Sequence, residues 1–149
     1  MRAVTLALTL GIAAAPAGAD EPIGTAFSLP VPDAERGRTL FVNKGCVVCH
    51  SVNGVGGETA PALDATEPAG VFDPLDFAAR IWKGAEAMIA LQSMELGYVV
   101  DLSGRDIADL AAFAENHTLQ RQFSEDEIPE PIRGWTLDQP IAPDAMQPE

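Results

Sequence analysis

The sequence predicts a small all-α domain with an N-terminal export signal and an extended C-terminal tail. Three observations support this fold class. Three segments with apolar residues at helical spacing each follow a residue typical of a helix start. No segment alternates apolar and polar residues as a half-buried strand does, and the chain has no internal repeat. After the first helical segment, the glycine-rich stretch SVNGVGGETAPAL excludes regular structure and predicts a loop.

The N-terminus has the pattern of a secretory signal peptide in residues 1–19. Arg2 gives a minimal positive region, residues 3–15 are apolar and uncharged, and the small-x-small sequence AGA ends at Ala19. This apolar run is shorter than the ~20 residues of a membrane span. We therefore expect cleavage after Ala19 and a periplasmic location, with a retained membrane anchor as the alternative. Residues 20–32, which contain three prolines and have no helical period, are expected to be a linker.

The first two helices have clear boundary signals. Asp33 is a good N-cap, and the helix that it begins is expected to end near Gly45. The second helix begins at the Asp73–Pro74 pair, since proline suits the first helical position. Gly84 is expected to bend or break this helix, and Gly97 is a natural stop.

The third helix has the strongest start signal. Ser103 and Asp106 match a capping box, and a stripe of apolar residues follows. After His117 the sequence becomes rich in acidic residues and proline. We therefore predict a single domain over residues 33–117 and an extended acidic, proline-rich tail over residues 118–149.

The sequence CVVCH carries the chemistry. Two thiols one short turn apart, Cys46 and Cys49, can reach the two vinyl groups on one edge of a porphyrin, and His50 can then project its imidazole under the iron. This pattern predicts one covalently attached haem c with His50 as an axial ligand. A thioredoxin-like dithiol would belong near a βαβ pattern, which is absent. A structural zinc site needs four ligands, and beyond the motif only the distant His117 is a candidate.

Residues around the motif resemble those of class I cytochromes c. In that family a helix with a glycine and, four residues later, an aromatic precedes C-x-x-C-H, and Gly37 and Phe41 match this pattern. The family's last helix crosses the first and packs a leucine and an aromatic against it, as Leu110 and Phe113 would. The resemblance covers residues 33–117 and implies helices wrapped around one haem.

The resemblance also implies what surrounds the iron. Pro61 stands where the family's proline carbonyl accepts a hydrogen bond from the ligating histidine. The family's distal ligand is a methionine a few residues before the last helix. Met94 lies nine positions before Ser103 and is closer to this pattern than Met88. We therefore expect Met94 as the distal ligand, with Met88, His117 or an open position as alternatives.

A six-coordinate haem predicts one-electron transfer and not enzyme catalysis, and no catalytic triad or phosphate-binding loop is evident. One alternative function is a cytochrome c subunit of a larger respiratory or dehydrogenase complex, which the linker and tail would suit. Another is a haem protein with an open distal site for sensing or catalysis. Trp82 is expected either to contact the porphyrin edge or a propionate, or to be an ordinary core residue.

The net charge of −13 restricts the partners. Nucleic acid binding needs a basic face, and the few Lys and Arg residues are scattered. We expect redox protein partners with a basic docking face. Contact with a membrane is expected only through a retained signal or a membrane complex, because no other segment is long and apolar enough to span a bilayer.

Overall fold

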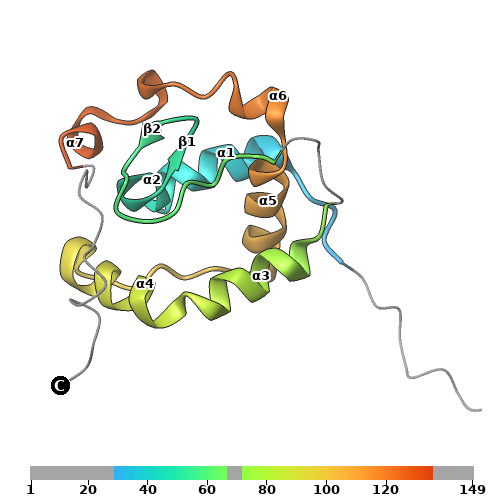
Figure 1. The fold of residues 1–149 in the computed structure, drawn as a ribbon, viewed down its shortest axis with the longest axis horizontal. Helices are drawn as coiled ribbons and strands as arrows, with labels where there is room; N and C mark the ends of the chain where they lie inside the picture. Colours follow the sequence, from blue (N-terminus) through green and yellow to red (C-terminus); the bar gives the residue numbers. More distant parts are fainter. Residues whose placement is uncertain (1–28, 67–71, 136–149) are drawn as a thin grey trace, which may run out of the picture.

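The computed structural model describes residues 29–66 and 72–135, and the regular structure in this part of the chain is helical apart from one short hairpin (Figure 1). The predicted signal peptide and most of the linker lie outside the described residues. The elements are, in chain order, α1 Ala34–Asn43, α2 Cys46–Cys49, β1 Ser51–Val52, β2 Val55–Gly56, α3 Pro74–Lys83, α4 Ala85–Leu91, the π-helical turn η1 Gln92–Leu96, α5 Gly104–Ala114, α6 His117–Gln120, the 3₁₀ turn η2 Glu125–Glu127 and α7 Glu130–Arg133.

The centre of the fold is the crossing of α1 and α5 (Figure 1). Gly37 permits the close approach, because a Cβ atom at this position would overlap the backbone carbonyl of Asp109 and lie 2.6 Å from its carbon. Beside the crossing, the rings of Phe41 and Phe113 pack with their centroids 5.8 Å apart. The four residues that carry the family resemblance, Gly37, Phe41, Leu110 and Phe113, are all buried.

The predicted starts of the three main helices are confirmed. The Asp33 side chain accepts a hydrogen bond from the Arg36 N–H at 3.1 Å. Asp73 likewise caps α3, with Pro74 as the first helical residue. Ser103 and Asp106 form the capping box at the start of α5. These caps satisfy backbone N–H groups that have no partner within the helix.

The break and the stop predicted for the second helix are also present. Gly84 separates α3 from α4, and Gly97, with a φ of +77°, ends η1. A positive φ favours glycine, because a Cβ atom would clash with the backbone in this conformation.

An ionic network fastens the start of α1 to α5. Asp109 is 0% exposed and accepts hydrogen bonds from the Asp33 backbone N–H at 2.7 Å and from the Arg36 guanidinium. The same guanidinium donates to Asp106 at 2.5 Å. A buried carboxylate is stable only when it is paired. The partners of Asp109 lie at the start of α1, so the pairing stabilises the contact between α1 and α5 at this point.

The prediction of an extended tail is wrong for residues 118–135, which fold onto the domain. Phe123 packs against both Phe41 and Phe113, with ring centroids 5.6 and 5.9 Å apart. Ile128 is also buried in the core. Nearby, the Arg38 Nε donates to Glu127 at 2.6 Å. A few well-spaced apolar residues therefore anchor an otherwise acidic, proline-rich segment, and its remainder, residues 136–149, lies outside the described residues.

We predict that Gly37→Ala destabilises the protein by about 1–3 kcal/mol or more, because the added methyl group must push α5 away. Gly104→Ala is the matched control. Gly104 also lies in a helix, but no atom lies within 4 Å of the position that its Cβ would occupy. The control is therefore expected to be neutral or stabilising by up to about 1 kcal/mol. Denaturant unfolding measures both, and equal effects of the two substitutions would contradict the close crossing.

A second prediction concerns stability at acid pH. Hydrogen bonds from Ser103, helped by Arg36, lower the pKa of Asp106 from its ordinary value to about 2. The folded state therefore binds this proton less readily than the unfolded state does. The stabilisation is complete above about pH 4, near the ordinary carboxyl pKa, and is lost as the pH falls toward 2.

Asp106→Asn should consequently unfold more easily than the unsubstituted protein at pH 7, and the difference should shrink between pH 4 and pH 2. Asp101→Asn, at an exposed position, is the control. The test is the free energy of unfolding of the two variants and of the unsubstituted protein, measured across this pH range. A difference that stays constant down to pH 2 would show that Asp106 does not act through its charge.

Candidate functional site

The site begins at the turn between α1 and α2. Gly45, with a φ of +78°, links the two helices in a left-handed conformation, and the single turn of α2 carries both cysteines. His50 then leaves the helix in an extended conformation, with its backbone N–H bonded to the Cys46 carbonyl at 2.9 Å. Both thiols are free and partly buried. The local fold thus places two thiols one turn apart and an imidazole directly after them.

His50 is held in one tautomer. Its Nδ1 donates to the Pro61 carbonyl at 2.7 Å, so the lone pair lies on Nε2. Burial lowers the pKa of His50, and the bond to Pro61 opposes this shift. A neutral imidazole with Nε2 unprotonated is the form that binds a metal. The hydrogen bond implied by the family resemblance is therefore present, while the iron-binding role of His50 stays a prediction.

The two thiols are protonated at neutral pH. Burial raises the pKa of Cys46 to about 11. The pKa of Cys49 is also raised, first by burial and then by the charge of Glu95. A catalytic dithiol needs a lowered thiol pKa, since the thiolate is the nucleophile. These surroundings therefore disfavour the thioredoxin-like alternative.

The glycine-rich stretch after the motif folds back onto α2. Gly57 donates its N–H to the Val47 carbonyl at 2.9 Å, and Ala60 donates to the Cys49 carbonyl at the same distance. A Cβ atom at Gly57 would lie 2.7 Å from the Val48 carbonyl carbon, so the close return needs glycine. This requirement explains why glycines cluster here in the sequence.

The sequence predicts only a loop in this stretch, whereas the structure contains the hairpin β1–β2. Val52 pairs with Val55, and Ser51 pairs with Gly56. Strands of two residues are too short to show the alternation of apolar and polar residues by which a strand is recognised in a sequence.

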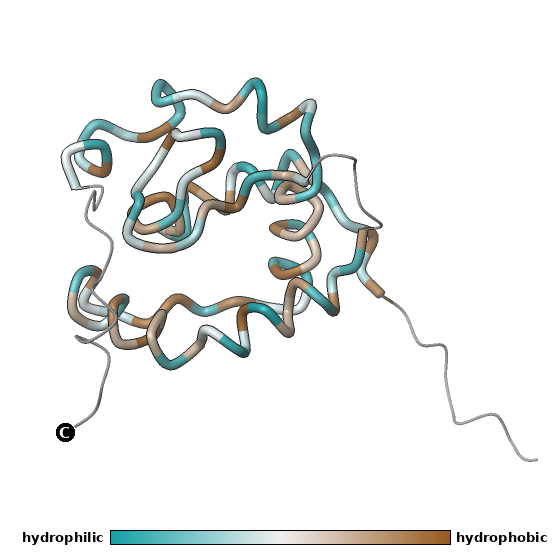
Figure 2. Tube along the Cα trace, in the orientation of Figure 1, coloured by the Kyte–Doolittle hydropathy of each residue, from teal (hydrophilic) through white to brown (hydrophobic). Residues whose placement is uncertain are grey.

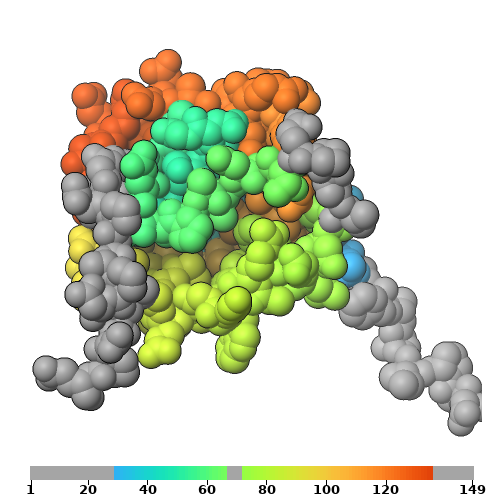
Figure 3. Space-filling view, in the orientation of Figure 1, coloured from blue at the N-terminus to red at the C-terminus, as the bar shows by residue number. Residues whose placement is uncertain are grey.

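The segment α3–α4–η1 lies across from α2 and the hairpin, and the surface between them is hollowed (Figures 1 and 3). Apolar and polar residues are mixed along this segment (Figure 2), yet α4 and η1 contain no buried residue. Between α3 and the chain after η1, several large apolar side chains are exposed, namely Leu75, Trp82, Ile89, Met94, Tyr98 and Val99. This segment therefore offers apolar surface to a further group, as the wall of a haem site would.

The predicted distal residues lie on this segment. Met94 is 73% exposed and sits in η1, whereas Met88 is partly buried in α4. Trp82 is 81% exposed, so the alternative that it is a core tryptophan is wrong. Its predicted contact with a porphyrin edge or propionate stays a prediction.

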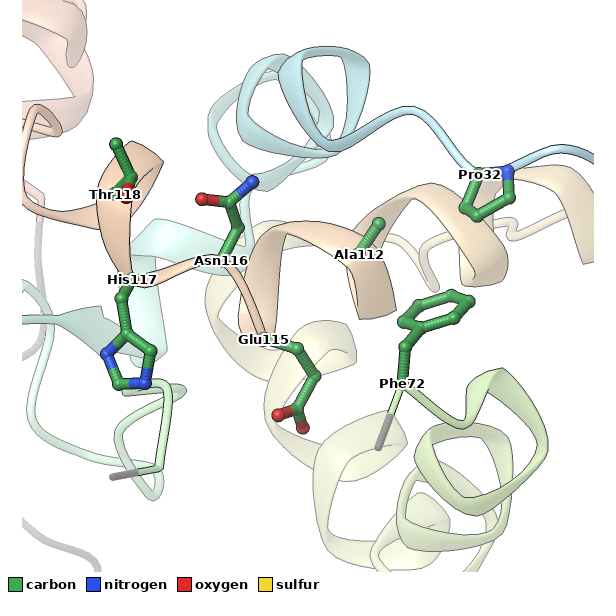
Figure 4. Close-up of a pocket in the computed structure, with 7 residues that line it drawn as sticks. All are labelled: Pro32, Phe72, Ala112, Glu115, Asn116, His117 and Thr118. Carbon is green, nitrogen blue, oxygen red and sulfur yellow. The ribbon is translucent and has the colours of Figure 1, made fainter. Parts of the chain in front are cut away.

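His117, the alternative distal ligand, lies elsewhere. Its Nε2 donates to the Thr66 carbonyl at 2.6 Å, so this nitrogen carries a proton and has no lone pair for iron. Its ring lines a shallow pocket at the C-terminal end of α5, together with Phe72, Glu115 and others (Figure 4). Apart from His117, none of the residues predicted to hold the haem lines that pocket.

The residues present fit a covalently attached haem. The paired thiols and the neutral imidazole are in place, and exposed apolar side chains lie on the segment across from them (Figure 1). A protein-bound metal without a porphyrin fits less well, because residues 29–66 and 72–135 contain no group of three or more His, Cys, Asp and Glu side chains that could hold one. In the same described residues, no helix is long and apolar enough to cross a membrane.

Sequence reasoning missed two residues of the site. Gln120 bonds to the loop that carries Pro61, and no sequence signal marked it, because the segment around it was expected to be extended. Glu95 lies close enough to Cys49 to affect its pKa. In the sequence, Met94 is a candidate ligand in that turn, but no pattern marks its neighbour Glu95.

A helical domain built around a CVVCH turn of this geometry defines a c-type cytochrome domain. The family model described as Cytochrome c matches residues 34–118, and the chain belongs to that family. The match implies a covalently bound haem c with iron and electron transfer through it. Neither the search of curated proteins nor the search of solved structures found a match.

Proposed function

We propose that the protein is a periplasmic one-electron carrier with a single haem c, attached through Cys46 and Cys49 and ligated by His50. The observation that carries this proposal is the hydrogen bond from His50 Nδ1 to Pro61, which leaves Nε2 as an acceptor directly after the turn that bears both thiols. When bound, haem iron alternates between its ferric and ferrous states. The chain's own residues fix the axial imidazole and provide apolar surroundings that restrict water.

The helices are proposed to wrap around the haem, with α3–α4–η1 as the wall opposite α2. The exposed apolar side chains of this wall, Trp82 among them, support the proposal, because a porphyrin would cover apolar area that is otherwise in contact with water. A π-helical turn supports it further, since such turns occur frequently at functional sites.

Met94 is the proposed distal ligand, with Met88 as the alternative. A Cβ atom built on Gly45 would lie 3.6 Å from the Leu96 side chain and 3.7 Å from the Tyr98 hydroxyl. The end of η1 therefore lies next to the start of the haem-attachment turn. Met94 belongs to η1, whereas Met88 lies earlier, in α4.

The location and partners are proposed from sequence and charge. The signal-like residues 1–19 support export, and the mass of the mature chain tests for cleavage after Ala19. The net charge of −13 supports a redox partner with a basic face, and a fall in electron-exchange rate with rising salt tests for it. Because residues 118–135 fold onto the domain, they give no support to the alternative of a subunit with a free tail.

The proposal predicts that haem stays attached through denaturation. The purified protein should retain haem staining in a denaturing gel and contain one haem per chain by its alkaline pyridine spectrum, because thioether bonds survive unfolding. A variant with both Cys46→Ser and Cys49→Ser should lose the stain. Haem that acidic acetone extracts from the unsubstituted protein would refute covalent attachment.

Replacing the distal ligand should change the spectrum and the potential. Met94→Ala is expected to abolish the methionine–iron band of the oxidised protein, lower the midpoint potential and admit carbon monoxide, because a thioether favours the ferrous state. Met88→Ala is the matched control. It should keep the band and cost less than the ~2–5 kcal/mol typical of a buried methionine, since Met88 is partly exposed. Loss of the band in Met88→Ala alone would assign the ligand to Met88.

A further inference from the structure

Gln120 is a buried polar residue whose bonds join two separate parts of the fold. Its side chain is 1% exposed and lies in α6. The Nε2 atom lies within donating distance of the Leu63 carbonyl at 2.8 Å, and of the Phe113 and Ala114 carbonyls at 3.1 and 3.2 Å. The Oε1 atom accepts the Ala65 N–H at 2.8 Å. This side chain therefore connects the C-terminal end of α5 to the loop that follows the hairpin.

That loop carries the carbonyl that orients His50. Pro61 accepts the His50 Nδ1–H, and Leu63, two residues later, donates its N–H to the Ser51 carbonyl at 2.9 Å. Gln120 bonds to the carbonyl of Leu63 and to the N–H of Ala65, so the hairpin and α6 both bond to this loop. The position of the Pro61 carbonyl thus depends on both sets of bonds.

Two other side-chain bonds to the loop are more exposed than those of Gln120. The Asn53 N–H donates to Asp64 at 2.6 Å, and His117 donates to Thr66, both in exposed surroundings. Water competes with such bonds, whereas a buried amide that loses its partners leaves buried donors and acceptors unsatisfied. The amide of Gln120 is therefore a stronger constraint on the loop than these two exposed side-chain bonds.

We propose that Gln120 is a positioning residue for the axial histidine and acts on His50 through the Pro61 loop. This inference rests on the proposed function, in which His50 is an iron ligand. A carbonyl held at hydrogen-bond distance from Nδ1 raises the basicity of the imidazole, and a more basic ligand stabilises the ferric state. Gln120 consequently keeps the midpoint potential lower than it would be with a loose loop.

The test compares Gln120→Leu and Gln120→Glu with Leu119→Ala in the haem-loaded protein. Leucine preserves approximate volume and removes every bond to the loop. Glutamate keeps the acceptor for Ala65 but removes the amide donor. Leu119 is buried in the same short helix, and its side chain belongs to the apolar core. Leu119→Ala therefore controls for loss of stability alone.

Gln120→Leu should raise the midpoint potential and shift the NMR resonance of the His50 Nδ1 proton, and Gln120→Glu should do the same to a smaller extent. Leu119→Ala should lower the unfolding midpoint and leave the potential and the resonance unchanged. If Gln120→Leu does not fold, the midpoint potential and the His50 resonance of Gln120→Glu test the proposal.

An unchanged potential in the Gln120 variants, with haem still attached, would overturn the positioning role and leave the proposed function standing. A shift of equal size in Leu119→Ala would also overturn it, since any loosening of α6 would then suffice. Haem extracted by acidic acetone from the unsubstituted protein would instead refute the proposed function itself.

Discussion

The contact between α1 and α5 at Gly37 is the constraint on which the rest of the structure depends. Two helices approach this closely only where one of them has no side chain, and the Asp109 backbone occupies the space that a Cβ atom would need. The close approach lets Arg36 reach the buried Asp109 carboxylate and lets Phe41 pack on Phe113. A single missing side chain thus permits an ion pair and an aromatic contact, and each of these in turn favours the same crossing.

The crossing also determines where the two halves of the site lie. From its C-terminal end, α1 leads through Gly45 directly into the turn that bears the cysteines. The C-terminal end of α5 leads to Gln120, which holds the loop whose Pro61 carbonyl orients His50. The motif and its support therefore lie far apart in the sequence and depend on the same pair of helices. A change in the crossing angle would move one relative to the other.

The sequence predicted those parts of the fold that depend on neighbouring residues. The caps at Asp33, Asp73 and Ser103 involve side chains and N–H groups within three positions, so their signals are local. The hydrogen bond from His50 to Pro61 was predictable only through the family resemblance. The packing of Phe123 on α1 and α5 was not predictable, because acidic and proline-rich composition describes the average of a segment, whereas its anchoring depends on a few apolar residues and distant partners.

The segment α3–α4–η1 buries little of its own apolar surface, so its stability depends on what covers it. Phe77 is its one buried residue among those described, and it ties α3 to α5 near the start of the segment. Beyond that point the apolar side chains have few contacts with the core, so local opening there costs less free energy than opening of the α1–α5 pair. A haem bound between this segment and α2 would bury those side chains and stabilise the folded state over the unfolded one. Covalent attachment to α2 would make that stabilisation independent of the concentration of free haem.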